Sequence, residues 1–242
     1  MTDPEAAAVT YPEAHHAHRE VSGGWLRPAV FGAMDGLVSN TALVAGVAGG
    51  GVHPRAIALT GLAGLAAGAF SMAAGEYTSV ASQSELAEAE IAVERAELTH
   101  RPETERAELA RLYVSRGVEP ELAGLVAAQL SRDPEQALRI HTREELGVDV
   151  DALPSPVTAA LSSFAAFSVG ALLPVLPYLL GVRTLWPAIV VAFVGLFACG
   201  ALVSKVTARS WWFSGLRQLL LGAAAAGLTY AFGSLVDAAL GS

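Results

Sequence analysis

Five long apolar runs constrain the fold of this chain more than any other feature of its sequence. Each is about 20 residues or longer, which is enough for a helix to cross a hydrocarbon core of about 30 Å. One such run would fit a buried helix of a soluble protein, but five runs with few charges predict an all-α integral membrane protein with five transmembrane helices. The expected spans are residues 29–51, 56–80, 157–181, 185–204 and 212–236.

Between the second and third spans lies a polar insert, residues 83–151, which carries most of the charge. It holds sixteen of the 23 acidic residues but only eight of the 15 basic ones, so its net charge of −8 equals that of the whole chain. Such an excess of carboxylates is suited to binding cations. Because the insert is attached to a bundle of membrane helices, its composition points to metal transport.

The distribution of arginines predicts which side of the membrane the insert occupies. With a cytoplasmic N-terminus, Arg19, Arg27 and the insert's eight arginines lie inside, whereas only Arg55 and Arg183 lie outside. The positive-inside rule therefore predicts a cytoplasmic insert and an external C-terminus. Fourteen arginines against a single lysine suggest a bacterial genome, and residues 1–20 contain no apolar signal segment. We therefore expect a multi-pass protein of the bacterial plasma membrane.

Prolines and glycines divide the insert into helices. Nothing breaks the helical pattern over residues 56–99, so the second span is expected to continue into the cytoplasm as one helix about 65 Å long. Further helices are expected to begin at Pro102, Pro120 and Pro134 and to end at Gly117 and Gly147. The predicted domains are a polar N-terminal tail (1–24), transmembrane helices 1–2 (25–82), a cytoplasmic helical metal-binding domain (83–153) and transmembrane helices 3–5 (154–242).

Two pairs of glutamates in the insert are candidate metal ligands. Residues three apart on a helix share a face. Glu94 and Glu97 are therefore expected on one face of their helix, and Glu105 and Glu108 on one face of the next. Two antiparallel helices joined near residues 99–102 would bring the pairs together, and four carboxylates converge favourably only around cations. A later helix offers further ligands, His141 and Glu145, which are four residues apart and therefore share a face. Carboxylates with one imidazole suit Fe(II), Mn(II) or Zn(II).

Three residues of the first two spans are candidates for a transport pathway. Asp35 lies within the first span, where an ionisable group is costly and usually faces a pathway or a proton relay. Glu76 lies near the inner end of the second span, and Met72 precedes it by one helical turn on the same face. A thioether favours transition metals over Mg(II) and Ca(II). Ser39 and Asn40 offer further polar atoms one turn beyond Asp35.

Three stretches of the chain resemble the vacuolar iron transporter family, which includes the yeast calcium-cross-complementer and plant vacuolar iron transporter group. They are FGAMDGLVSNTALVAGV (31–47), SMAAGEYTSVASQSE (71–85) and SPVTAALSSFAAFSVGALLPVLPYLL (155–180). The resemblance implies a homodimer of five-span subunits with a pore at the dimer interface, lined by the first helices. It also implies a cytoplasmic three-helix domain that collects Fe(II), and export from the cytosol coupled to inward proton movement.

Under this resemblance, Asp35 falls on the family's pore aspartate, Met72 on its pore methionine and Glu76 on the glutamate of the same motif. The glutamates of the family's metal-binding domain are matched by Glu94, Glu97, Glu105, Glu108 and Glu145. One departure concerns the last helix of the insert. Plant members carry methionines one turn before the last glutamate, where this chain has His141 and Thr142, so an imidazole nitrogen is expected to replace a thioether.

The sequence therefore predicts a proton-coupled Fe(II) transporter that moves iron out of the cytosol, and not an enzyme. Its partners are expected to be a second copy of the chain, membrane lipids, divalent metal ions and protons. Mn(II), Co(II) or Zn(II) efflux remains an alternative, as does a membrane-tethered iron-storage or metal-sensing protein. A membrane-tethered iron store or oxidase would need Glu-x-x-His pairs on two helices, which the insert does not offer.

Other chemistry finds little support in the sequence. Cys199 is the single cysteine and lies within a predicted span, so neither a disulfide nor a cysteine metal site is expected. No basic stretch with interleaved aromatic residues indicates nucleic-acid binding. No prosthetic group is expected, and Fe(II) is predicted to be the transported ion.

Overall fold

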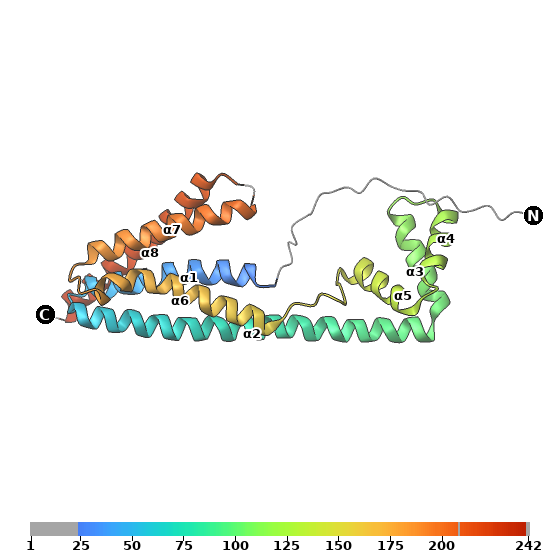
Figure 1. Cartoon of the computed structure of the whole chain (residues 1–242), viewed down its shortest axis with the longest axis horizontal. Helices are drawn as coiled ribbons and strands as arrows, with labels where there is room; N and C mark the ends of the chain where they lie inside the picture. The colour runs from blue at the N-terminus through green and yellow to red at the C-terminus, as the bar shows by residue number, and fades with distance from the viewer. Residues whose placement is uncertain (1–23, 208, 241–242) are drawn as a thin grey trace, which may run out of the picture.

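One helix extends along the whole molecule (Figure 1). In the computed structural model, which describes residues 24–207 and 209–240, α2 continues without a break from Pro54 to His100. Its 47 residues span about 70 Å, which confirms the prediction that the second apolar run continues into the polar insert. The predicted N-terminal tail, residues 1–24, lies outside the described residues except for Gly24.

Five helices are long and apolar enough to cross a membrane. They match the five predicted spans to within a few residues, apart from the long polar continuation of α2 and a few additional residues of α8. The protein is thus an all-helical, multi-pass membrane protein in the part of the chain that the structure describes. Besides α2, the membrane-length helices are α1 (Leu26–Gly49), α6 (Pro156–Leu179), α7 (Leu185–Thr207) and α8 (Trp211–Leu240).

Helices α1 and α6 form the centre of the membrane bundle because glycines bring their backbones together. A Cβ atom added at Gly32 would lie 2.7 Å from the carbonyl oxygen of Ser163, and one added at Gly36 or Gly170 would lie closer still to the facing backbone. Small residues permit such approaches between membrane helices, where packing rather than the hydrophobic effect drives association. Helix α2 packs against α6 and α1, which holds its first half beside the bundle.

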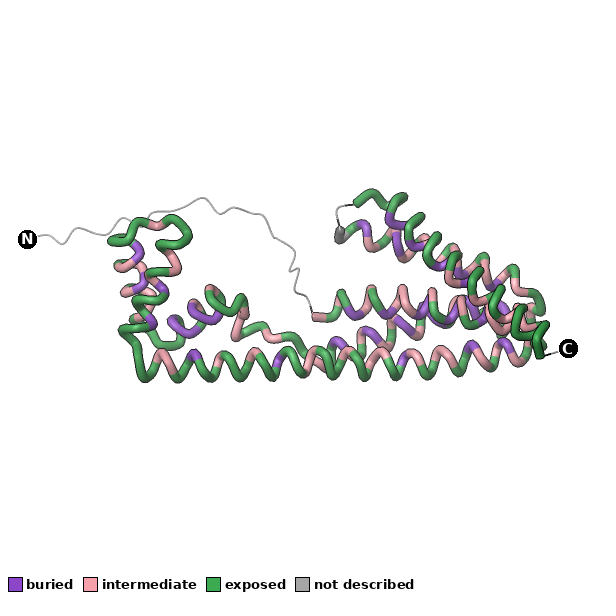
Figure 2. Tube along the Cα trace, turned by 180° about the vertical axis from the view of Figure 1, so that it is seen from behind, coloured by how far each residue is buried: buried purple, intermediate pink, exposed green. Residues whose placement is uncertain are grey.

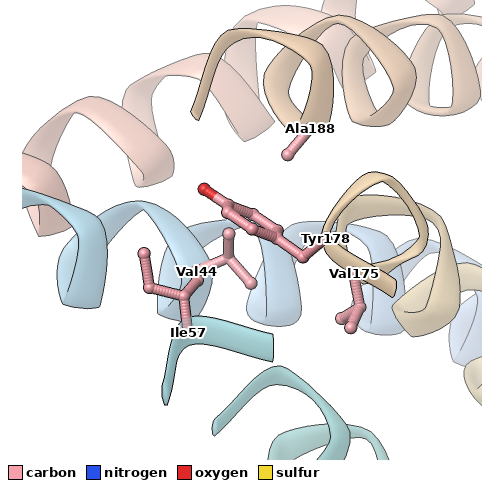
Figure 3. Packing of buried hydrophobic residues seen from close by; sticks show 5 residues of the cluster. All are labelled: Val44, Ile57, Val175, Tyr178 and Ala188. Atoms are coloured by element: carbon pink, nitrogen blue, oxygen red, sulfur yellow. The ribbon is translucent and has the colours of Figure 1, made fainter. Parts of the chain in front are cut away.

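A compact apolar cluster closes the end of the bundle that lies away from the insert. It consists of Val44, Ile57, Val175, Tyr178 and Ala188, from α1, α2, α6 and α7 (Figure 3). Buried contacts among four helices fix their relative positions at this end. Elsewhere many large apolar residues of the membrane helices are exposed, as expected for surfaces that face lipid, and Figure 2 shows exposed positions along each of these helices.

The polar insert folds as short helices at the far end of α2 (Figure 1). They begin at the predicted prolines, which suit a first helical turn because its N–H groups have no intrahelical partner. Gly117 and Gly147 follow helix ends with φ of 96° and 67°, a left-handed conformation that glycine adopts without strain. The elements are α3 (Pro102–Ser115), α4 (Pro120–Leu130), α5 (Pro134–His141) and a π-helical turn, η1 (Thr142–Leu146).

Candidate metal centre

The chain turns sharply between α2 and α3 at a single residue, and α3 leads away from α2 instead of running back along it as the antiparallel pair expected from the glutamate spacing would (Figure 1). Arg101 caps both helices, with φ −135° and ψ 48°, and Pro102 starts α3 directly after it. The last turns of α2 therefore lie beside the first turn of α3. This brings Glu94 and Glu105 together, and both are buried, with 6% and 5% of their surface exposed.

Helix α5 supplies the third side of the site. The Asp133 side chain caps it by accepting a hydrogen bond from the Glu135 backbone N–H at 3.0 Å. Ala137 and Leu138 pack inwards one turn before His141, whose side chain is fully buried. His141 thereby points to the two carboxylates, and one ligand atom from each of Glu94, Glu105 and His141 lies within 4.8 Å of the other two.

The distances in this cluster fit His–carboxylate ion pairs and also fit shared ligation of one ion. His141 Nδ1 lies 3.0 Å from Glu94 Oε1 and 3.2 Å from Glu145 Oε1, and among the described residues Glu94 Oε1 and both His141 ring nitrogens lack a hydrogen bond of good geometry. Two ligands about 2.1 Å from one metal ion, at a right angle, are about 3.0 Å apart. Because buried polar atoms without partners are costly, a cation between them would stabilise this arrangement.

The carboxylates of the cluster raise one another's proton affinity. Burial raises the pKa of Glu94 to about 7, with further contributions from the charges of Glu145, Glu105, Glu97 and Glu108. Burial likewise raises the pKa of Glu105 and of Glu145, and the charge of His141 opposes both shifts. The site therefore concentrates negative charge that protons or metal ions can neutralise.

The arginines of the insert form ion pairs mainly with carboxylates outside the cluster. Their partners include Glu135, 2.6 Å from Arg95, and Asp149, 2.6 Å from Arg143. Within the described residues, the carboxylates in ion pairs with arginine are Glu103, Glu108, Glu135, Glu144, Asp149 and Asp151. Glu94 and Glu105 are not among them, so no arginine pair in these residues competes with a proton or a metal ion for the buried carboxylates.

The predicted ligands thus separate into a centre and a rim. Glu94, Glu105 and His141 form the centre with Glu145 beside them, whereas Glu97 is half-buried and Glu108 is exposed. Residues three apart differ in direction by about 60° around a helix, so only one member of each glutamate pair points fully inwards. Glu97 and Glu108 are still close enough for their charges to raise the pKa of Glu94.

The insert contains a Glu-x-x-His spacing at Glu97 and His100, but the structure does not bring His100 into the cluster. Its side chain is exposed, and its Nδ1 lies 2.6 Å from the Ala96 carbonyl oxygen of the preceding turn. The metal-ligand cluster formed by the described residues contains one histidine, His141. This composition differs from the two Glu-x-x-His pairs of a ferritin-like di-iron site.

The predicted pathway residues line two adjoining hollows on the α1–α2 side of the membrane bundle. Asp35 and Met72 line a cavity of about 260 Å³ together with Asn40. Met72 also lines a neighbouring cavity of about 200 Å³, which contains Glu76 and lies towards the insert. The sequence did not indicate the other five lining residues of the first cavity, which are Leu43, Gly64, Gly68, Ser71 and Phe167. Phe167 comes from α6, and no local sequence signal indicates its place there.

The raised pKa of Glu94 predicts that the metal-free insert is more stable in mild acid than in alkali. A carboxyl group whose pKa rises from 4.5 in the unfolded chain to about 7 in the folded one stabilises the fold fully below pH 4.5. That stabilisation is lost as the pH rises through 7. In chelator-treated protein, amide exchange in α5 and the end of α2, corrected for intrinsic rates, should be slower near pH 5.5 than near pH 8. Equal or faster exchange near pH 5.5 would contradict the assignment.

Comparison with known proteins identifies a family and several relatives that this chain resembles. A model of the VIT family matches residues 26–234. A vacuolar iron transporter of Acanthamoeba castellanii is 39% identical over 216 residues, covering 85% of this chain and 74% of that protein. Vacuolar iron transporter homolog 5 of Oryza sativa subsp. japonica is 35% identical, covering 95% and 88%. Vacuolar iron transporter 1 of the same plant is 29% identical, covering 95% and 93%. These matches include both the membrane helices and the insert.

Proposed function

This chain belongs to the VIT family, and from that premise we propose that it is a proton-coupled Fe(II) transporter that moves iron out of the cytosol. The insert captures the ion, and the hollows along α1 and α2 conduct it across the membrane. The observation that carries the proposal is the buried cluster of Glu94, Glu105 and His141, whose ligand atoms converge without arginine partners.

The donor set of the cluster favours borderline divalent metals. Two buried carboxylates and one imidazole, with Glu145 at 3.2 Å from that imidazole, offer the mixed oxygen and nitrogen ligands that suit Fe(II), Mn(II), Co(II) and Zn(II). His141 stands where plant members of the family carry a thioether, so efflux of one of the other three metals is the second candidate. Competition among the four ions in one flux assay separates these possibilities.

Helix α2 connects capture with conduction. Glu94 and Glu76 lie on the same unbroken helix, about 27 Å apart along its axis. From Glu76 the route continues through the cavity that it shares with Met72, and then into the cavity of Asp35. The thioether of Met72 favours a transition metal over Mg(II) or Ca(II) at this point.

Proton coupling follows from competition for the same oxygens. A carboxylate that binds a metal ion must first release its proton, so metal binding and protonation oppose each other. In this mechanism Asp35 or Glu76 takes up a proton from the external side as the ion leaves, and returns it to the cytosol before the next ion binds. The cytoplasmic position of the insert rests on the distribution of arginines.

The homodimer is part of the same proposal. The cavities of Asp35 and Glu76 lie on a face of α1 and α2 that also carries exposed apolar side chains, including Phe31 and Leu43. A carboxylate that faced lipid directly would be costly. A second copy of the chain, packed on this face, would enclose the carboxylates in a protein-lined pore.

Metal-driven proton movement tests the proposal. In proteoliposomes with the insert outside and a pH-sensitive dye in the lumen, external Fe(II) under anaerobic conditions should raise the luminal pH as ions enter and protons leave. Mg(II) at the same concentration provides the control and should give no response, because it prefers oxygen ligands alone. Entry of Fe(II) without a luminal pH change would rule out the coupling.

A further inference from the structure

Asn40 carries a buried polar atom that no described group satisfies. The Nδ2 group donates hydrogen bonds to the carbonyl oxygens of Gly61 on α2, at 3.1 Å, and Ala171 on α6, at 2.6 Å. Oδ1 has no hydrogen-bond partner, and the residue is 2% exposed. Because two acceptors surround the nitrogen, exchanging the nitrogen and oxygen would place three oxygens together. The hydrogen bonds therefore fix the orientation of the amide.

The free oxygen of Asn40 faces Gly64 of α2. A Cβ atom at Gly64 would lie 2.8 Å from Oδ1 and 2.5 Å from Cδ2 of Leu43. Asn40, Leu43 and Gly64 all line the cavity that contains Asp35. Glycine at this position leaves room beside Oδ1, and the flexible end of the Leu43 side chain occupies part of it.

Leu43 also separates two hollows. Besides the cavity of Asp35, it lines a groove of about 530 Å³ between α1 and α8 at the end of the bundle away from the insert. That groove is mostly apolar, with Thr229 and Asp237 among its polar residues. Asn40 lies about 7.5 Å further along α1 than Asp35, in the direction of this groove. The unsatisfied oxygen therefore lies between the carboxylate of the cavity and the groove beyond.

We propose that Asn40 Oδ1 is the next oxygen ligand for the divalent cation after Asp35, and that Leu43 covers this oxygen until the ion moves away from the insert. This inference rests on the proposed transport function. A dehydrated cation needs successive oxygen or sulfur ligands inside a membrane, and a carbonyl-type oxygen held by two hydrogen bonds is ready to bind it without reorganisation. The two Nδ2 hydrogen bonds keep the oxygen in place while the ion passes.

The variant Gly64→Ala tests this role because its methyl group, which would meet Oδ1 at 2.8 Å and Leu43 Cδ2 at 2.5 Å, forces the flexible end of Leu43 to move and blocks the approach of an ion to Oδ1. In proteoliposomes with an imposed pH gradient, the maximal rate of Fe(II) uptake should fall about tenfold, the effect of losing about one ligand's stabilisation of the moving ion. The KM for Fe(II) should change less than about twofold, because Asp35 and Met72 still receive the ion. Asn40→Leu should give the same loss of rate.

Gly227→Ala is the matched control, because a Cβ atom at Gly227 meets nothing within 4 Å. Amide exchange in α1 and α2 measures whether Gly64→Ala preserves the packing of these helices, and it should remain as in the wild type. Wild-type uptake kinetics in Gly64→Ala would overturn the inference, as would a rate that falls only together with lost exchange protection. Absence of uptake by the wild-type protein would instead contradict the proposed function, so the two failures are distinguishable.

Discussion

Replacing Glu94 by glutamine is expected to have opposite effects on the metal-free and the metal-bound insert. The substitution keeps the shape of the side chain but removes a buried negative charge, whose pKa is raised to about 7 by burial and by four neighbouring glutamates. Near pH 8 the metal-free insert should therefore become more stable. Metal affinity should fall by about 100-fold, because a charged ligand is lost from the centre of the site.

Two measurements separate these effects. Amide exchange of the chelator-treated protein reports the stability of α5 and the end of α2, and calorimetric titration with Co(II) in detergent reports the affinity. Glu90→Gln, an exposed glutamate on the same helix, provides the control and should change neither quantity appreciably. If Glu94→Gln bound Co(II) as tightly as the wild type, the buried cluster would not be the metal centre.

Replacing Asp35 by asparagine is expected to stop transport while metal capture continues. Asp35 lines the mid-membrane cavity with Met72 and Asn40, and its charge offsets the loss of hydration that a divalent ion suffers there. Asparagine preserves the size of the side chain but can neither supply that charge nor carry a proton. Fe(II) uptake into proteoliposomes should fall by about 100-fold or more, since a full ionic partner is lost.

The Asp35→Asn protein should still bind Co(II) at the insert with wild-type affinity, because the cavity contacts the first half of α2, at Gly64–Met72, whereas Glu94 lies in its second half. Glu85→Gln, which removes an exposed charge from the polar part of α2, serves as a charge-matched control and should transport normally. Uptake unchanged by Asp35→Asn would remove this residue from the route. Loss of both uptake and insert binding would indicate a general folding defect.

The membrane helices and the boundaries of the insert were predictable because local chemistry determines them. Runs of apolar residues fix the spans, as bilayer thickness sets the length that a helix needs. The continuous α2 followed from the absence of any breaker before Pro102. The helix ends at Gly117 and Gly147 followed from the left-handed conformation that glycine permits.

The metal centre was only partly predictable, because periodicity gives the face of a helix but not its exact direction. The spacing of the glutamates indicated convergence of α2 and α3. It did not show that Glu94 and Glu105 would be buried while Glu108 remained exposed. That result depends on how α5 packs against α2. This packing involves contacts between residues far apart in the sequence, such as Arg95 with Glu135 and Glu94 with His141. The π-helical turn at Thr142–Leu146, which carries Glu145, had no sequence signature either.

The membrane cavity could also be predicted only in part from the sequence. Asp35 stood out because an ionisable side chain within a span is costly unless it serves a pathway, and Met72 because its thioether is a ligand for transition metals one turn before Glu76. The contribution of α6 could not be inferred from local patterns. Phe167 lines the cavity from α6, and the Ala171 carbonyl fixes Asn40 through a hydrogen bond between residues 131 positions apart. The free oxygen of Asn40 becomes visible only in three dimensions.

Accumulation of iron against its own gradient tests the central claim most directly. Proteoliposomes that contain the wild-type protein, with the insert outside and an acidic lumen, should concentrate Fe(II) above the external level under anaerobic conditions. Collapse of the pH gradient with a protonophore should release the excess. Uptake that only equilibrates, or that matches protein-free liposomes for Fe(II), Mn(II), Co(II) and Zn(II), would contradict proton-coupled metal transport by this chain.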